Sequence, residues 1–128
     1  MRMTSHLLIV DDEAAIGFAL SEYFACSGWE TDWVESLDEA KAQVRAQHYT
    51  AAIIDLCLSG GEGTEGLEVL DELHRQHPET LCILLTAYGS PWATAEARRR
   101  GAALIVDKPA RLAELQRELQ RLRGTGVS

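Results

Sequence analysis

The chain has 128 residues and a formal net charge of −8, a length that suits one domain and is too short for two ordinary ones. Apolar residues make up 46% and charged residues 25% of the sequence, which is typical of a globular protein and excludes a disordered chain or a fibre. The acidic balance argues against direct binding of nucleic acid. Every aliphatic run is far shorter than the ~20 residues of a membrane span, so we expect no membrane contact.

The cysteines and the amino-terminal segment bear on the compartment. The three cysteines (Cys26, Cys57 and Cys82) are odd in number and lack CxxC spacing. They fit reduced thiols better than a disulfide or zinc framework. No signal-peptide pattern precedes the first acidic residues, and we therefore expect a cytoplasmic protein.

Short apolar runs, each bounded by polar or turn residues, recur along the chain. They are too short for helices and predict strands buried on both faces of a sheet. One further segment, with alternating polar and apolar residues, is a weaker candidate for a strand. The five predicted strands are, in chain order, Leu7–Val10, Trp29–Val34 (the alternating segment), Ala51–Ile54, Leu81–Leu85 and Ala103–Val106.

Amphipathic segments between these runs predict helices. The first, Asp12–Cys26, has apolar residues at four-residue spacing and ends at a Ser-Gly pair, a common helix stop. The motif Ser36-x-x-Glu39 is a capping box, in which two side chains satisfy the free N–H groups of a helix start. It predicts a second helix that ends at about Gln47.

Three more helices complete the pattern. Leucines at 67, 70 and 73 mark the third, which we expect to end before Pro78. Ser90-Pro91 is an N-cap followed by proline at the first helical position, and it opens a fourth helix that ends near Gly101. Leucines at 112, 115, 119 and 122 mark the fifth.

This order, a strand followed by a helix five times over, predicts a parallel sheet with helices on both faces. Such sheets bind their ligands outside the carboxyl ends of the strands, where the strand order reverses. In a sheet of order 2-1-3-4-5, that point lies between strands one and three.

Polar residues stand where the predicted strands end. Asp11 and Asp12 follow the first strand and Asp55 follows the third, while Thr86 and Lys108 follow the fourth and fifth. Three carboxylates brought together repel one another unless a cation lies among them, and an all-oxygen site suits a hard cation such as Mg²⁺. An ammonium and a hydroxyl beside them are suited to hold the oxygens of a phosphoryl group.

Four fragments carry a resemblance to a known family: LIVDDE, IIDLCL, LLTAYGS and VDKP, in that order and spacing. Each alone is a weak signal, but the ordered set is similar to the receiver domain of two-component response regulators. The resemblance implies a flavodoxin-like (βα)5 fold of strand order 2-1-3-4-5. It covers about residues 6–123, and we predict that residues 1–128 form one receiver domain.

The resemblance also implies a role for each matching residue. Asp55 would accept a phosphoryl group from a sensor histidine kinase or a phosphotransfer protein. Asp12 and Asp55 would bind Mg²⁺ directly, Asp11 would orient it through water, and the Cys57 backbone carbonyl would complete the protein ligands. Lys108 would pair with the phosphoryl group.

A further set of residues would transmit the signal. Thr86 would hydrogen-bond the phosphoryl group and move inward, which would bias the loop Ala87–Ser90 and the fourth helix. The peptide bond before Pro109 is similar to one that is cis in the family. The domain would not be an enzyme in its own right, and it would assist only its own phosphorylation and slow dephosphorylation.

The sequence departs from the family pattern beside the acceptor. Ser59 stands where the family usually has proline, and the usual glycine of this loop corresponds to Gly66. The loop Leu56–Glu65 is thus about three residues longer than usual. A tolerated surface insertion and a specific kinase contact are the two interpretations.

Two other positions differ. Ile105 stands where the family has its switch aromatic, so the usual coupling of Thr86 to an aromatic ring cannot operate. A substitute ring from Tyr88 or Trp92 is the alternative that the sequence leaves open. Cys57 and Tyr88 stand at the positions that flank the path of the hydrolytic water, and neither is a carboxylate or carboxamide. These two residues predict a long-lived phosphorylated state.

Charge is unevenly distributed, with a net charge of −12 through Ser90 and +4 after it. Solvated helix faces are one interpretation. The other is that the face of helix four, strand five and helix five meets an output protein or a second copy of the chain. Its basic residues include Arg98, Arg99, Arg100, Arg111 and Arg117.

Competing functions stay open from the residues alone. A degenerate receiver that acts only as a docking module would not need the acidic set. A phosphohydrolase with an aspartyl nucleophile would need a second carboxylate close behind Asp55, where the chain has Leu56-Cys57. A flavin or nucleotide site would need a phosphate-binding loop in place of Asp11-Asp12. The chain is either a single-domain regulator or a fragment of a protein with an effector.

Overall fold

The computed structural model describes residues 5–58, 65–87 and 91–125, and in the last segment it describes side chains through residue 122. The ten elements alternate from strand to helix as the sequence predicts. They are β1 (His6–Val10), α1 (Ala14–Cys26), β2 (Glu30–Val34), α2 (Leu37–Ala46), β3 (Ala51–Asp55), α3 (Glu65–Gln76), β4 (Leu81–Thr86), α4 (Pro91–Arg99), β5 (Leu104–Asp107) and α5 (Leu112–Thr125).

The five strands form one parallel sheet of order β2-β1-β3-β4-β5, so the predicted fold class is confirmed. In register, Val10 lies beside Ile54, Asp55 beside Leu85, and Thr86 beside Asp107. The strands therefore finish at one common edge of the sheet. This edge is where the polar residues of the predicted site occur.

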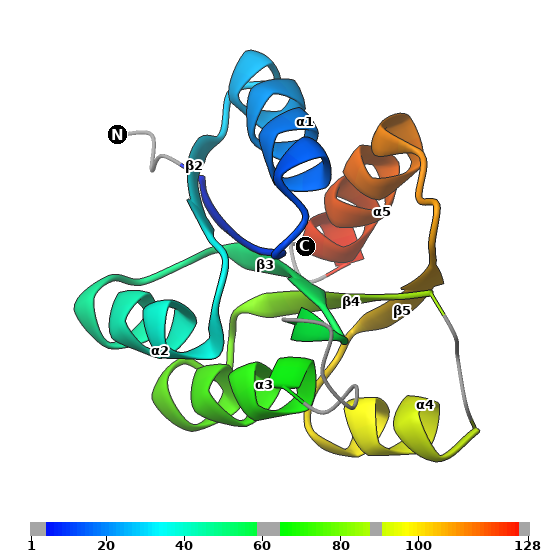
Figure 1. Ribbon diagram of the computed structural model, residues 1–128. Helices are drawn as coiled ribbons and strands as arrows, with labels where there is room; N and C mark the ends of the chain where they lie inside the picture. The colour runs from blue at the N-terminus through cyan, green and yellow to red at the C-terminus, as the bar shows by residue number, and fades with distance from the viewer. Residues whose placement is uncertain (1–4, 59–64, 88–90, 126–128) are drawn as a thin grey trace.

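Helices cover both faces of the sheet. Helices α1 and α5 lie on one face, and α2, α3 and α4 lie on the other (Figure 1). Alternate residues of each strand supply the two cores: Ile9 and Ile53 face α1 and α5, while Leu8 and Ile54 face the other three helices. Burying these aliphatic side chains contributes most of the stability, at about 25 cal/mol per Å² of apolar surface.

Strand β5 differs from the expectation of full burial. Strands β3 and β4 are buried almost throughout, but β5 has three half-buried residues followed by an exposed one. The reason is position, because β5 is an edge strand with only β4 beside it. A short apolar run therefore did not distinguish an edge strand from a central one.

The helix starts follow local chemistry. Ser36 caps α2, and its hydroxyl accepts a hydrogen bond from the Glu39 N–H at 3.2 Å, as the capping box predicts. The Glu39 carboxylate accepts a hydrogen bond from the N–H of Glu35, one residue before the usual partner. Ser90, the predicted cap of α4, lies outside the described residues.

Gly66 is required by close packing at the end of β3. Its N–H donates to the Leu56 carbonyl at 3.0 Å. A Cβ at this position would lie 2.6 Å from the Asp55 carbonyl oxygen and 2.6 Å from the Leu56 Cα, which is too close for any side chain. Glycine thus lets α3 start directly against the strand that carries Asp55.

Candidate functional site: an acidic cluster with one lysine

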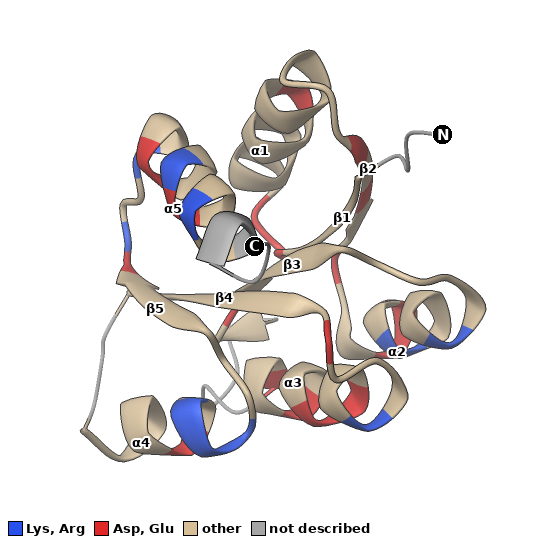
Figure 2. Ribbon diagram, turned by 180° about the vertical axis from the view of Figure 1, so that it is seen from behind, with Lys and Arg blue, Asp and Glu red and all other residues tan. Residues whose placement is uncertain are grey.

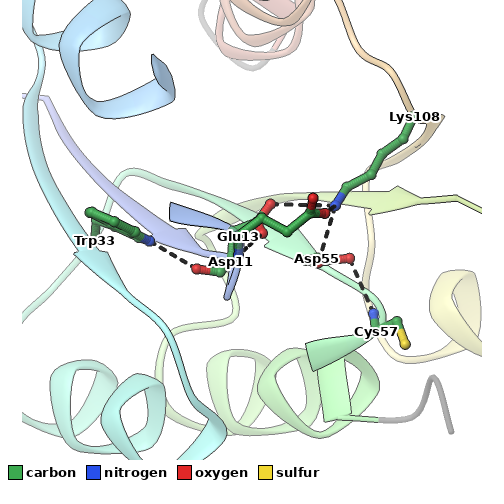
Figure 3. A network of polar contacts seen from close by, with 6 residues as sticks. All are labelled: Asp11, Glu13, Trp33, Asp55, Cys57 and Lys108. Carbon is green, nitrogen blue, oxygen red and sulfur yellow. Dashed lines mark hydrogen bonds and ion pairs between the residues drawn. The ribbon is translucent and has the colours of Figure 1, made fainter. Parts of the chain in front are cut away.

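The predicted site residues converge at the carboxyl edge of the sheet. Asp55 ends β3 and Thr86 ends β4, while Asp11 follows β1 and Lys108 follows β5. Figure 3 shows the side chains of Asp11, Asp55 and Lys108 pointing toward one another. Residues almost a hundred positions apart in the sequence thus form one cluster.

Lys108 lies at the centre of this cluster. Its Nζ lies 3.1 Å from Asp55 Oδ2, 3.1 Å from Glu13 Oε1 and 3.5 Å from Asp11 Oδ2. Burial alone would lower the pKa of Lys108, but the hydrogen bond to Glu13 and the charges of Asp55 and Asp11 outweigh it, and the pKa is raised. The lysine is therefore a permanent cation among the carboxylates.

Asp11 is buried, with 1% of its surface exposed. Its Oδ1 accepts a hydrogen bond from the Glu13 N–H at 2.9 Å, whereas its buried Oδ2 accepts no hydrogen bond from any described residue and has only the ion pair to Lys108. Burial raises the pKa of Asp11 to about 6, and the charge of Asp55 adds to this effect. An incompletely satisfied carboxylate oxygen is what a cation would complete.

Asp55 is likewise buried, with 4% exposure. One carboxylate oxygen meets Lys108, and the other accepts a hydrogen bond from the Cys57 N–H at 3.2 Å. Burial raises the pKa of Asp55, although Lys108 opposes the shift. The strand and the two hydrogen bonds hold the carboxylate in one orientation.

The cluster contains the donor set of a divalent-cation site. Asp11, Asp12 and Asp55 each offer a carboxylate oxygen within 4.8 Å of those of the other two. All three donors are hard oxygen atoms, which suit Mg²⁺ or Ca²⁺ and not softer metals. The unsatisfied Asp11 Oδ2 supports the same conclusion, so the residues present fit such an ion.

The predicted switch residues lie beside the cluster. Thr86 is buried at the end of β4 and lines a small hollow together with Ile105 of β5 and Ala93 of α4. The isoleucine side chain therefore occupies the side of Thr86 that faces α4. Ala87 is exposed, and Tyr88 lies outside the described residues.

The peptide bond between Lys108 and Pro109 is cis, as predicted. Pro109 and Lys108 also line a groove of about 520 Å³ between α1 and α5. Most of the other lining residues are apolar: Ala15, Ile16, Ala19, Leu20, Leu85, Ala110, Leu112 and Leu115. The groove thus gives apolar surface next to the charged cluster.

Sequence reasoning missed two contacts of the cluster. Glu13 forms an ion pair with Lys108, although LIVDDE had directed attention only to its aspartates. The Trp33 indole Nε1–H donates to the Asp11 backbone carbonyl at 2.9 Å (Figure 3). Nothing in the sequence predicts this second contact, because it depends on how β2 and the end of β1 lie in three dimensions.

Gly17 makes room for the Trp33 ring. A Cβ on Gly17 would lie 2.1 Å from Trp33 Cε2, so the ring packs directly against the backbone of α1. Trp33 therefore contacts both the first turns of α1 and the backbone of Asp11. This pair positions one carboxylate of the cluster.

A five-stranded parallel sheet of this order, with an acidic cluster and a lysine at its carboxyl edge, is the arrangement that the resemblance to receiver domains implies. A family model described as the response regulator receiver domain matches residues 7–120. The chain belongs to this family. It is thus a receiver domain of the two-component signalling type, as the four motifs had suggested.

Two individual relatives show the same likeness to regulatory proteins. The chain is 35% identical over 104 residues to the photosynthetic apparatus regulatory protein RegA of Rhodobacter capsulatus, covering 81% of this chain and 55% of RegA. It is 34% identical over 116 residues to the two-component response regulator PhoP of Pseudomonas aeruginosa, covering 91% of this chain and 50% of PhoP. The chain thus spans about half the length of these two relatives.

A solved structure shows the same fold. A CheY-like response regulator receiver domain protein from Methanospirillum hungatei JF-1 superimposes with a TM-score of 0.87 at 24% identity, covering 93% of each chain. Within the part of the chain that is described, no helix combines the length and the apolar character needed to cross a membrane.

The contact between Gly17 and Trp33 predicts that one substitution has opposite effects on stability in two backgrounds. Gly17→Ala should destabilise the protein by about 1–3 kcal/mol, because the new methyl group displaces the indole. In a Trp33→Ala background, the same change should be neutral or stabilising, because alanine favours a helix over glycine by about 1 kcal/mol. Urea unfolding, monitored by circular dichroism, measures the free energy of unfolding of the unchanged protein, the two single variants and the double variant.

The same sign in both backgrounds would contradict the contact. Trp33→Phe is a further variant, which removes the N–H donor together with part of the indole that packs against Gly17. It should therefore cost more than the about 0.5–1.5 kcal/mol of one hydrogen bond.

Proposed function

We propose that the domain is a phosphorylation-controlled switch that accepts a phosphoryl group on Asp55 with the help of Mg²⁺. One observation carries this proposal: a buried carboxylate, Asp55, lies 3.1 Å from the ammonium of Lys108 within a cluster that offers two further carboxylates. Membership of the receiver family supports the same role. The donor would be a sensor histidine kinase or a phosphotransfer protein.

The proposed reaction is a direct transfer. A carboxylate oxygen of Asp55 forms the new bond to phosphorus while the bond from phosphorus to the donor histidine nitrogen breaks, and its electron pair stays on the imidazole. Lys108 lies close enough to Asp55 to hold a peripheral oxygen of the phosphoryl group. Mg²⁺, held by Asp12, Asp55 and the Cys57 carbonyl and oriented through Asp11, would neutralise the developing negative charge.

The surroundings of Asp55 suit a phosphodonor that is itself a protein. The apolar groove between α1 and α5 begins at Glu13 and Lys108, next to the acceptor. A donor that rests on this groove would bring its phosphohistidine to the exposed side of the cluster. The thiols of Cys26, Cys57 and Cys82 are not in disulfides, which fits a cytoplasmic location, and we also propose that location.

The response would begin at Thr86. A phosphoryl group on Asp55 adds negative charge and acceptor oxygens beside this hydroxyl. Thr86 and Ile105 line the same hollow with Ala93 of α4. A movement of Thr86 would therefore change the packing against α4. We therefore propose that the signal passes from β4 to α4 through aliphatic packing, without a switch aromatic.

A first experiment tests the acceptor. The protein is incubated with Mg²⁺ and a small phosphodonor such as acetyl phosphate, and its intact mass is measured over time. We expect a gain of one phosphoryl group, which Asp55→Asn abolishes and Lys108→Ala strongly reduces. Glu68→Gln, an exposed change on α3, is the matched control and should leave phosphorylation unchanged.

The same measurement separates the alternatives. A mass gain that survives Asp55→Asn would contradict the assignment, and no gain at all would favour a docking module. Rapid release of phosphate with repeated turnover would favour a phosphohydrolase. We expect instead a slow loss of the group over minutes, because neither Cys57 nor Tyr88 has a side chain that orients water readily.

A second prediction concerns Mg²⁺ and pH. Without a cation, burial raises the pKa of Asp11 from 3.8 to about 6. The folded state therefore binds the proton more tightly than the unfolded chain, and the ionisation of Asp11 lowers stability as pH rises from about 4 to above 6. A bound cation offsets this loss only where the carboxylates are ionised.

Thermal unfolding with and without Mg²⁺ checks this linkage. Mg²⁺ should raise the melting temperature at about pH 7.5 and have little effect at about pH 5. Asp12→Ala should remove the effect at the higher pH. An equal shift at both values, or an unchanged shift in Asp12→Ala, would contradict a cation site at these carboxylates.

The output surface is the third part of the proposal. Basic residues gather on α4 and α5, whereas α3 is mostly acidic (Figure 2). Arg99 and Arg100 pair with Glu96 of the same helix, and Arg100 also pairs with Asp71. Arg98, Arg111 and Arg117, by contrast, form no ion pair with any other described residue. Their side chains can therefore contact a partner, whereas the ion pairs of Arg100 join α4 to α3.

We propose that α4, β5 and α5 form the face that meets an output protein or a second copy of the chain. A groove between β5 and α5 is lined by both signs of charge, among them Asp107, Arg111, Glu114 and Arg117. Mixed charge of this kind suits pairing with a like surface.

Charge reversal tests this face. Arg98→Glu combined with Arg117→Glu should weaken self-association of the phosphorylated chain several-fold in sedimentation velocity, because like charges would then meet across the contact. Phosphorylation by acetyl phosphate should be unchanged. Lys41→Glu on α2 is compared with the single change Arg98→Glu as the control for net charge, because each reverses one basic residue. An equal effect of Lys41→Glu would contradict the assignment, and a monomeric phosphorylated chain would favour an output protein.

A further inference from the structure

Two histidines and a glutamate gather at the opposite edge of the sheet. His48 lies between α2 and β3, and His77 and Glu79 lie between α3 and β4. Each offers a ring nitrogen or a carboxylate oxygen within 4.8 Å of those of the other two. The rings of His48 and His77 meet edge to face, with centroids 4.6 Å apart, and His48 Nε2 contacts Glu79 Oε2.

We propose that His48, His77 and Glu79 form a second metal site, for a transition-metal dication such as Zn²⁺. Imidazole nitrogens favour zinc, copper and nickel over magnesium. Two histidines with one carboxylate are a donor set that zinc proteins use, and they leave a fourth position for water or another ligand. This proposal does not depend on the phosphorylation of Asp55.

The orientation of His77 supports metal binding. Its Nε2 lies 3.2 Å from the Val44 carbonyl oxygen. Because a carbonyl only accepts, Nε2 carries the proton of the neutral ring, and Nδ1 keeps its lone pair. Metal-binding histidines are typically held in this way, with the second ring nitrogen donating to a carbonyl or carboxylate.

Glu79 is suited to be the anionic ligand. Its carboxylate contacts His48 Nε2 and lies with both histidines in one cluster. The side chains of His48 and Glu79 are 57% and 59% exposed, which leaves the site open to solvent. An ion can therefore enter without a rearrangement of the core.

The backbone holds the two loops in fixed positions. The buried Thr80 hydroxyl donates to the Tyr49 carbonyl at 2.7 Å and so links the residues next to Glu79 and His48. The Thr80 N–H donates to the His77 carbonyl at 3.1 Å. The ligand-bearing segments are therefore tied to each other before any ion binds.

The preceding helices are joined in the same way. Helices α2 and α3 lie side by side on one face (Figure 1). The buried carboxylate of Glu72 on α3 accepts hydrogen bonds from Arg45 of α2 at 3.2 Å and from Gln76 at 3.1 Å. A rigid pair of helices thus presents His48 and His77 together.

The second site is separate from the acidic cluster. The ligands precede β3 and β4, whereas Asp55 and Thr86 end those strands. A five-residue strand spans roughly 16 Å, so an ion at one edge does not touch the other. Zinc binding should leave the acceptor accessible.

Zinc titration of the full chain tests the proposal. Saturating Mg²⁺ is added first, so that the acidic cluster does not compete, and zinc affinity is measured by calorimetry. His48→Ala and His77→Ala should each weaken zinc binding roughly tenfold or more, because the loss of a residue that only supports a metal ligand already costs about 10–100-fold. His74→Ala removes a histidine of α3 that lies outside the cluster and should change nothing.

Nuclear magnetic resonance of the histidine ring nitrogens locates the ion. Zinc should shift the rings of His48 and His77 and leave those of His6 and His74 in place. Unchanged affinity in both alanine variants, or no shift of either the His48 or the His77 ring on addition of zinc, would overturn the proposal. Should His77→Ala fail to fold, His48→Ala and Glu79→Gln, both at exposed positions, decide the question. Circular dichroism confirms that each variant is folded.

Discussion

The ion pairs of Lys108 hold the carboxyl edge of the sheet together. Asp11 and Asp55 are both buried, and two buried carboxylates side by side repel each other strongly. The ammonium of Lys108 lies within 3.5 Å of both. Without it, ionising both carboxylates in the folded protein would cost more. A bound divalent cation would add to the same compensation of charge.

The sheet supplies the geometry that makes the ion pairs possible. Parallel strands in register end at one edge, so Asp55 and Thr86 become neighbours although thirty residues of chain separate them. Gly66 and Trp33 then fix the backbone at the two acidic positions, one by close packing and one by a hydrogen bond. The packing of the core thus determines where the charged side chains of the site lie.

Much of this arrangement could be predicted from the sequence. Apolar runs and helix-cap motifs together predicted all ten elements, and the residues after the strands predicted which side chains would meet. The contacts of Glu13 and Trp33 could not be predicted, because a surface glutamate and a half-buried tryptophan carry no local signal for a distant partner. The burial of β5 was overestimated for a related reason: a run of aliphatic residues does not reveal which strand will be at the edge.

The hydrogen bond from Gly66 to Leu56 has an evolutionary consequence. It fastens both ends of the segment between β3 and α3 to the backbone beside Asp55. The entropy of closing such a segment grows only with the logarithm of its length, about 0.6 kcal/mol for each doubling. We therefore expect that residues can be inserted or deleted between these two anchors while Asp55 keeps its place. Such changes would let a lineage vary what surrounds the acidic cluster without rebuilding the cluster itself.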